Sequence, residues 1–269
     1  MDIEKQNLDP AQLARIEAVH RGFLYQHLYV AACLFQAGIS GVTHVVVEND
    51  EDLELVLSGK RIYAQIKTRS SPIVLSDISG ALGRFDALRA EHVAGHRTGT
   101  AEFAIVSNSP PGPELSKRIA NTSWPADVAF ICPGKPPTDK SGLPRAWKNI
   151  SEGMFACRMA ANDLPFATLA PETLVWKLAG RILAAAAGID PYSDHTFIVQ
   201  DLPALFEQLI IQLQDFPAPP LNYRVQDQEP ALVSNHRVRL ITGFSGAGKT
   251  SWAAETALHT SDRLAYYDV

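Results

Sequence analysis

The stretch "LELVLSGKRIYAQIKTR", residues 53–69, alternates apolar and polar residues in the way that a β-hairpin does. The alternation breaks at Ser58-Gly59, and X-Gly is a preferred composition for a two-residue hairpin turn. Successive residues of a strand point to opposite faces, so the apolar faces of the two strands coincide only when Leu57 pairs with Lys60. The sequence therefore predicts an antiparallel hairpin with a defined register.

The same register predicts a polar cluster. It places Asp52 beside Gln65, and Lys67 lies on the same face as Gln65. A carboxylate and an amide oxygen can ligate Mg²⁺, a hard cation that prefers oxygen ligands. A neighbouring ammonium can orient an attacking water or stabilise a phosphorus centre. The alternative is an ordinary hairpin whose outer face carries solvated charges, which is common in antiparallel sheets.

Four features of residues 15–110 occur together: Gly22-Phe23-Leu24-Tyr25-Gln26 on an expected helix, Glu48 ahead of Glu51-Asp52, Gln65-x-Lys67, and a later helix with Leu82 and Phe85. In this combination the chain resembles the PD-(D/E)xK nuclease superfamily, in its Mrr-like form where glutamine replaces the second acid. It looks still closer to the endonuclease domain of CBASS effector nucleases, which bacteria use in antiphage defence. The proline of the founding motif is absent before Asp52.

The resemblance implies a restriction-endonuclease-like α/β core, with a mixed central β-sheet flanked by helices, that cuts double-stranded DNA with Mg²⁺ or Mn²⁺. Carried over by position, Asp52 is the main metal ligand and Gln65 a second ligand. Lys67 is the catalytic lysine, and Glu48 and Gln26 are supporting residues.

The hairpin is also locally basic. Lys60, Arg61 and Arg69 join Lys67 in a chain whose net charge is −5. The overall charge argues against a protein that coats nucleic acid, but a local basic surface can still face DNA phosphates. The alternative is that these charges protect an edge strand from aggregation.

A second motif lies near the end of the chain. The pattern G-x-x-x-x-G-K-[ST] is that of a phosphate-binding loop, in which backbone N–H groups wrap the phosphates, the lysine reaches the outer phosphates and the hydroxyl ligates Mg²⁺. We expect a strand over residues 238–242 before it and a helix over residues 251–259 after it. A glycine-rich turn without function is the alternative reading. The residues expected to bind ATP or GTP with Mg²⁺ are Gly243, Gly246, Gly248, Lys249, Thr250 and Ser251.

Hydrophobic periodicity predicts the remaining elements. The helices are expected over residues 11–37 with Gly38 as the C-cap, 77–92 with Ser76 or Asp77 as the N-cap, 114–120, 172–187 and 202–216. Strands are expected over residues 42–48, 101–107 and 127–132, and a loop-rich stretch over residues 133–159.

The chain reads as two domains. We expect an endonuclease domain over residues 1–215, a proline-rich linker over residues 216–230, and over residues 231–269 the first piece of a P-loop α/β domain that continues beyond this chain. The three cysteines are scattered and odd in number, which favours a reducing cytoplasm over a disulfide framework. The longest apolar stretch is interrupted by Lys177 and Arg181, so no membrane span or membrane partner is expected.

The sequence thus predicts a metal-dependent DNA endonuclease that serves as an effector in bacterial antiphage defence. The fused NTPase would regulate it through homo-oligomerisation. One alternative is a catalytically inactive DNA-binding or interaction module attached to an ATP-dependent NTPase. Another is a nucleotide-dependent motor such as a restriction translocase.

Overall fold

The computed structural model describes residues 9–137, 142–164, 170–210, 220–225, 229, 240–244 and 246–259. The chain divides into two compact units, Met1–Ile210 and Ile211–Val269, each of which is described by itself. The division lies near the predicted domain boundary. Among the described helices, none has both the length and the apolar character needed to cross a membrane.

The first unit is an α/β fold built on a mixed six-stranded sheet flanked by helices, which confirms the predicted α/β fold class. The strand order is β5-β4-β3-β2-β1-β6. The three strands β3, β4 and β5 run parallel, while β6, β1, β2 and β3 are joined by antiparallel pairing. The strands are β1 Val42–Val47, β2 Leu53–Leu57, β3 Lys60–Lys67, β4 Thr100–Ser107, β5 Val128–Ile131 and β6 Thr196–Ile198.

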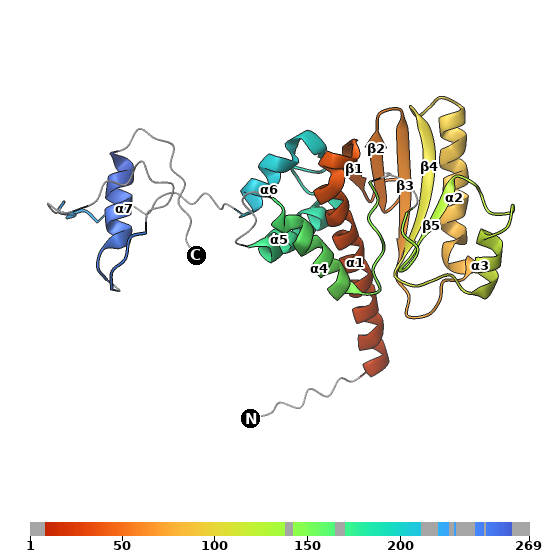
Figure 1. Cartoon of the computed structure of the whole chain (residues 1–269), viewed down its shortest axis with the longest axis horizontal. Coiled ribbons are helices and arrows are strands. Elements are labelled where there is room, and N and C mark those ends of the chain that lie inside the picture. The colour runs from red at the N-terminus through yellow and green to blue at the C-terminus, as the bar shows by residue number, and fades with distance from the viewer. Residues whose placement is uncertain are drawn as a thin grey trace. The chain divides into compact units, whose positions relative to one another are not determined.

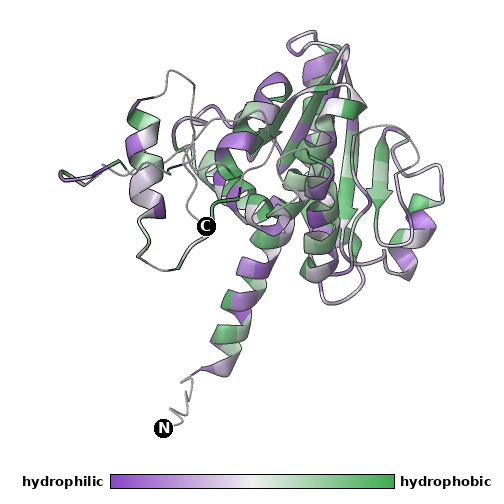
Figure 2. Ribbon diagram, turned by 60° about the vertical axis from the view of Figure 1, so that its left-hand side comes forward, coloured by the Kyte–Doolittle hydropathy of each residue, from purple (hydrophilic) through white to green (hydrophobic). Residues whose placement is uncertain are grey.

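Helices cover the two faces of the sheet differently (Figure 1). Helices α2 and α3 lie on one face, and the long helix α1 lies on the other, with α4, α5 and α6 packed beyond it. Figure 2 shows that the first turns of α1 stand clear of the sheet and of the other helices of this unit. The helices are α1 Pro10–Ser40, α2 Leu75–Val93, α3 Pro113–Ile119, α4 Ile150–Asn162, α5 Pro171–Ala186 and α6 Leu202–Ile210, the last preceded by a 3-10 turn, Val199–Asp201.

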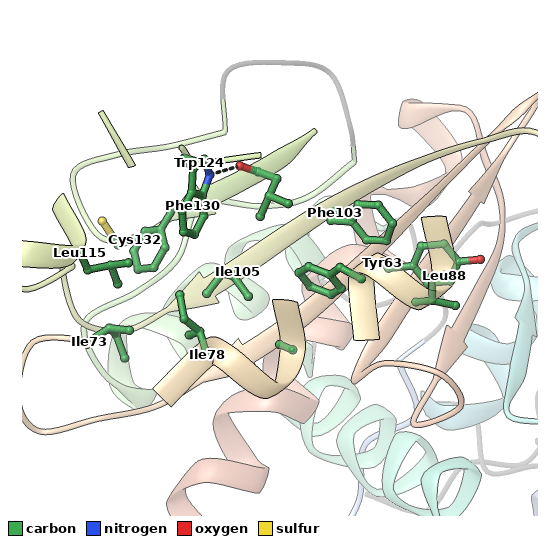
Figure 3. Close-up of a cluster of buried hydrophobic side chains, with 13 residues drawn as sticks. Tyr63, Ile73, Ile78, Leu88, Phe103, Ile105, Leu115, Trp124, Phe130 and Cys132 are labelled. Carbon is green, nitrogen blue, oxygen red and sulfur yellow. Dashed lines mark hydrogen bonds between the residues drawn. The ribbon is translucent and has the colours of Figure 1, made fainter. Parts of the chain in front are cut away.

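The hairpin is buried on both of its faces. Its leucine face lies on the side of the sheet that carries α1 (Figure 1). Tyr63, on the other face, is fully buried in an aromatic cluster beneath α2 (Figure 3). There the rings of Phe85 and Phe103 stack with centroids 4.8 Å apart, and Tyr63 stacks on Phe103 at 5.7 Å. Such ring pairs add to the free energy gained from burial alone. Because both faces are covered, the polar residues at the end of the hairpin lie in a partly desolvated environment.

Two predicted helix ends were wrong. Helix α1 continues through Gly38 and ends at Ser40, because Gly41 adopts the left-handed conformation (φ 74°) that terminates a helix. Helix α2 begins at Leu75, before the predicted caps. Asp77 lies in its first turn and accepts a hydrogen bond from the Val74 backbone N–H (2.9 Å), so its carboxylate caps the helix by reaching back along the chain.

Two elements were missed. Helix α4 occupies part of the stretch predicted to be loop. It is capped by Asn149, which accepts from the Glu152 backbone N–H (2.9 Å), and its buried side consists of small residues such as Gly153 and Ala161, which gave little hydrophobic signal. Strand β6 has only three residues and forms the edge of the sheet beside β1. The part of the predicted helix 202–216 after Ile210 lies outside the described residues.

Candidate active site

The predicted hairpin register is confirmed. Leu57 pairs with Lys60 across the Ser58-Gly59 turn, and Leu53 pairs with Ala64. At the open end of the hairpin, the Asp52 carboxylate receives two hydrogen bonds on the same oxygen, Oδ2. One comes from the Gln65 side-chain amide and the other from the Ile66 backbone N–H (2.7 Å).

A second carboxylate, that of Glu48 directly after β1, lies beside Asp52 at the open end of the hairpin. Glu48 accepts a hydrogen bond from the side chain of Gln26 on α1, and its backbone N–H donates to the carbonyl of Asp52 (3.3 Å). Glu48 has φ 49°, a left-handed conformation that is uncommon for a residue other than glycine and that recurs at functional sites. The structure therefore brings together Gln26, Glu48, Asp52 and Gln65, four of the residues singled out in the sequence.

Both carboxylates lie in surroundings that disfavour their charged forms. Burial raises the pKa of Asp52, against hydrogen bonds from Ile66 and Gln65 that lower it. Burial also raises the pKa of Glu48, and the negative charge of Asp52 raises it further. Two desolvated acids that repel one another are stabilised by a cation between them.

Lys67 lies at the end of β3, partly exposed, beside Ser107 at the end of β4. Its ammonium lowers the pKa of both Asp52 and Glu51, which places it within electrostatic reach of the cluster. Within the described part of the chain, its side chain makes no hydrogen bond or ion pair. Lys67 is thus a cation at the rim of the cluster that is not committed to a structural partner.

Sequence reasoning missed one participant, Arg84 on α2. Its guanidinium binds the Glu51 carboxylate with both ends, Nε to Oε1 at 2.7 Å and Nη2 to Oε2 at 2.9 Å. The same Nη2 donates to Oε1 of Gln65 at 2.5 Å. The Glu51 side chain is fully buried, whereas that of Arg84 is 49% exposed. Burial raises the pKa of Glu51, and Arg84 opposes that rise.

The predicted DNA-binding residues do not form one surface. Lys60 and Arg61 lie at the turn end of the hairpin, away from Lys67, and are neutralised there by Glu102 (3.0 Å) and by the buried Glu54 (2.5 Å). Arg69 follows β3 at the same end as Lys67 and pairs with Asp77 (3.1 Å). Of the three, only Arg69 lies near the polar cluster.

The donor set fits a magnesium ion in part. Within the residues that the structure describes, no group of three or more His, Cys, Asp or Glu side chains is placed to hold a metal ion. Mg²⁺ nevertheless keeps several waters and often uses only one or two carboxylates, and Glu48 and Asp52 supply that number. Gln65, the second predicted ligand, turns its amide nitrogen toward Asp52 and its oxygen toward Arg84.

The second unit contains the predicted phosphate-binding loop. Gly246 and Gly248 have φ of 80° and 77°, conformations that suit glycine, and helix α7, Lys249–Leu258, starts at the lysine. The Lys249 ammonium donates to the carbonyls of Gly243 and Phe244, both at 2.9 Å. Residues 240–242 form no strand, and the rest of the strand predicted over 238–242 lies outside the described residues.

The three cysteines are unpaired thiols, and all are buried. Burial raises the pKa of Cys157 to about 12, so this thiol stays protonated. They take no part in the polar cluster.

No protein-family model, no curated protein and no solved structure matches this chain.

Proposed function

We propose that the first unit is a metal-dependent endonuclease of the restriction-endonuclease-like kind and that it acts on double-stranded DNA. The observation that carries the proposal is the meeting of Asp52, Gln65 and Lys67 at one end of a mixed sheet. Glu48, which follows β1, and Gln26, on α1, lie at the same end of the sheet and are hydrogen-bonded to each other. An acid pair and an amide can hold a divalent cation, and a free ammonium can stabilise charge, which metal-dependent phosphodiester hydrolysis can use.

Each of these residues has a role in this proposal. Asp52 and Glu48 would hold Mg²⁺ or Mn²⁺, with Gln65 as a further oxygen ligand. The bound cation would lower the pKa of a water and neutralise charge on the phosphodiester. Lys67 orients the attacking water and stabilises the charge that develops on the phosphorus oxygens. Gln26 holds the Glu48 carboxylate in position.

The second unit supplies regulation in the same proposal. The loop from Gly243 to Ser251 would bind ATP or GTP with Mg²⁺, supported by its glycine conformations and by the lysine at the helix start. Nucleotide-dependent association of several chains would bring two nuclease units to the two DNA strands. Such an effector suits bacterial antiphage defence.

One observation favours a second candidate function. The amide of Gln65 is held between Asp52 and Arg84, which leaves its oxygen unavailable to a metal in the described arrangement. This favours a catalytically inactive DNA-binding or interaction module, with nucleotide turnover as the only chemistry of the protein.

Cleavage of supercoiled plasmid by the full chain, with Mg²⁺ or Mn²⁺ and ATP, separates the two candidates. Lys67→Ala should lower the cleavage rate by about a hundredfold or more, because the attacking water and the charged phosphate oxygens lose the Lys67 ammonium. The matched control is Lys117→Ala, which removes an exposed lysine paired with Glu114 on α3 and should leave the rate unchanged. Equal cleavage by Lys67→Ala and wild type would contradict the nuclease assignment. DNA binding without any cleavage would favour the second candidate.

A further inference from the structure

The direction of the Gln65 amide is fixed by its neighbours. An amide has one oxygen that accepts hydrogen bonds and one nitrogen that donates them. Arg84 has only donors, so the group facing it must be the Gln65 oxygen, and the NH₂ is left to face the Asp52 carboxylate. Both contacts agree on one orientation, because the reversed amide would set donor against donor at Arg84 and acceptor against acceptor at Asp52.

This orientation opposes metal ligation by Gln65. To ligate a cation beside Asp52, Gln65 would have to present its amide oxygen to it, so the amide would have to turn over. The NH₂ would then meet the Arg84 guanidinium, donor against donor. Arg84 cannot easily give way while it is held at two points by Glu51, a fully buried carboxylate that needs a cation of its own.

From this geometry we propose that Arg84 is a positioning residue that holds the oxygen of Gln65 away from Asp52 and so weakens metal binding at the candidate site. The proposal rests on the proposed nuclease function, because the metal site is the one assigned there. The Arg84 side chain is 49% exposed, but its two contacts with the buried Glu51 carboxylate hold it beside Gln65. The described arrangement is then the weakly metal-binding state of the site, in which Arg84 keeps the Gln65 oxygen turned away from Asp52.

The test is Mn²⁺ binding to the full chain without DNA or nucleotide, measured by electron paramagnetic resonance. The principal variant is Glu51→Gln combined with Arg84→Met, which removes both members of the ion pair and leaves the net charge of the site unchanged. Outer residues around a metal change its affinity by roughly ten- to a hundredfold. We expect the double variant to bind Mn²⁺ about tenfold more tightly than wild type.

A Gln65→Ala background shows whether Arg84 acts through the amide. In that background the double variant should give no gain, because there is no amide left to orient. An equal gain with and without Gln65 would overturn the proposal, as would unchanged or weaker Mn²⁺ binding in the double variant. Thermal unfolding of each protein reports whether it is folded. Arg84→Lys is the second variant, since lysine can keep Glu51 paired but lacks the fork that also reaches Gln65, and a gain in the same direction is expected.

Failure of the proposed function gives a different result. If Asp52→Asn leaves Mn²⁺ binding unchanged, the metal site itself is wrong, whatever the Arg84 variants do. If Asp52→Asn abolishes binding and the Arg84 variants bind no better than wild type, the metal site stands and the positioning role is refuted.

Discussion

Asp52→Asn should make the first unit more stable at neutral pH while it removes the proposed metal ligand. Both hydrogen bonds to Asp52 end on the same oxygen, so the single oxygen of asparagine can accept both, and none need be lost. The substitution removes the free-energy cost of burying a charged carboxylate, and this desolvation is the largest cause of the raised pKa of Asp52. The expected gain is about 1 kcal/mol in the free energy of unfolding, which corresponds to roughly 2–4 °C in Tm for a unit of this size.

The pH dependence of this gain follows from the sign of the pKa shift. Because the pKa of Asp52 is higher in the folded state, the folded chain holds its proton more tightly, and stability is lost as the pH rises through the folded pKa. Below the unfolded pKa the aspartate is neutral in both states, and the advantage of asparagine should vanish. The measurement is urea unfolding followed by near-UV circular dichroism at neutral pH and at about pH 3, which lies below the unfolded pKa of an aspartate.

A neighbouring aspartate provides the control with the opposite sign. Asp50 accepts a hydrogen bond from Arg97 at 2.6 Å, in a partly exposed ion pair. Asp50→Asn should therefore lower the free energy of unfolding at neutral pH, by up to about 1 kcal/mol. If Asp52→Asn is destabilising at neutral pH to the same degree as Asp50→Asn, the desolvation of Asp52 is not the dominant effect and the reasoning fails.

Two further predictions concern packing and the glycine loop. A Cβ added at Gly153 would lie 2.7 Å from the Trp147 ring, so Gly153→Ala should destabilise the fold by about 1–3 kcal/mol. A Cβ added at Gly180 on α5 would meet nothing within 4 Å, so Gly180→Ala should instead stabilise the fold by about 0.5–1 kcal/mol. Thermal unfolding measures both effects. Lys249→Ala should weaken ATP binding by roughly tenfold or more, because a charge-assisted contact to phosphate is lost, and calorimetric titration with Mg²⁺-ATP measures it. Unchanged affinity there would show that the loop does not hold phosphates.

The hairpin could be predicted because its side-chain period of two leaves a single register that aligns the apolar faces. That register alone brings Asp52 beside Gln65, although thirteen residues separate them along the chain. Glu48 and Gln26 were reached through resemblance. Their meeting depends on how α1 lies against the end of β1, which no local pattern contains.

Arg84 could not be predicted, for a related reason. It precedes Phe85, which is buried, and periodicity alone assigns such a residue to the edge of the helix face. Its partner depends on where α2 crosses the sheet. The one available signal was Glu51 beside Asp52, since a buried acid next to the site requires a cation from elsewhere in the chain.

The free N-terminal part of α1 has a consequence for local stability. Residues 9–21 are all exposed, and Tyr25 is the first buried residue of the helix. Its cap at Asp9 and an exposed i,i+4 ion pair between Arg21 and Glu17 hold this part only weakly, and isolated helices of that length are marginal in water. Its amide hydrogens should exchange with solvent far faster than those after Tyr25. Gln26 stands just inside that boundary, so the helix can open and close along its first turns while the contact to Glu48 persists.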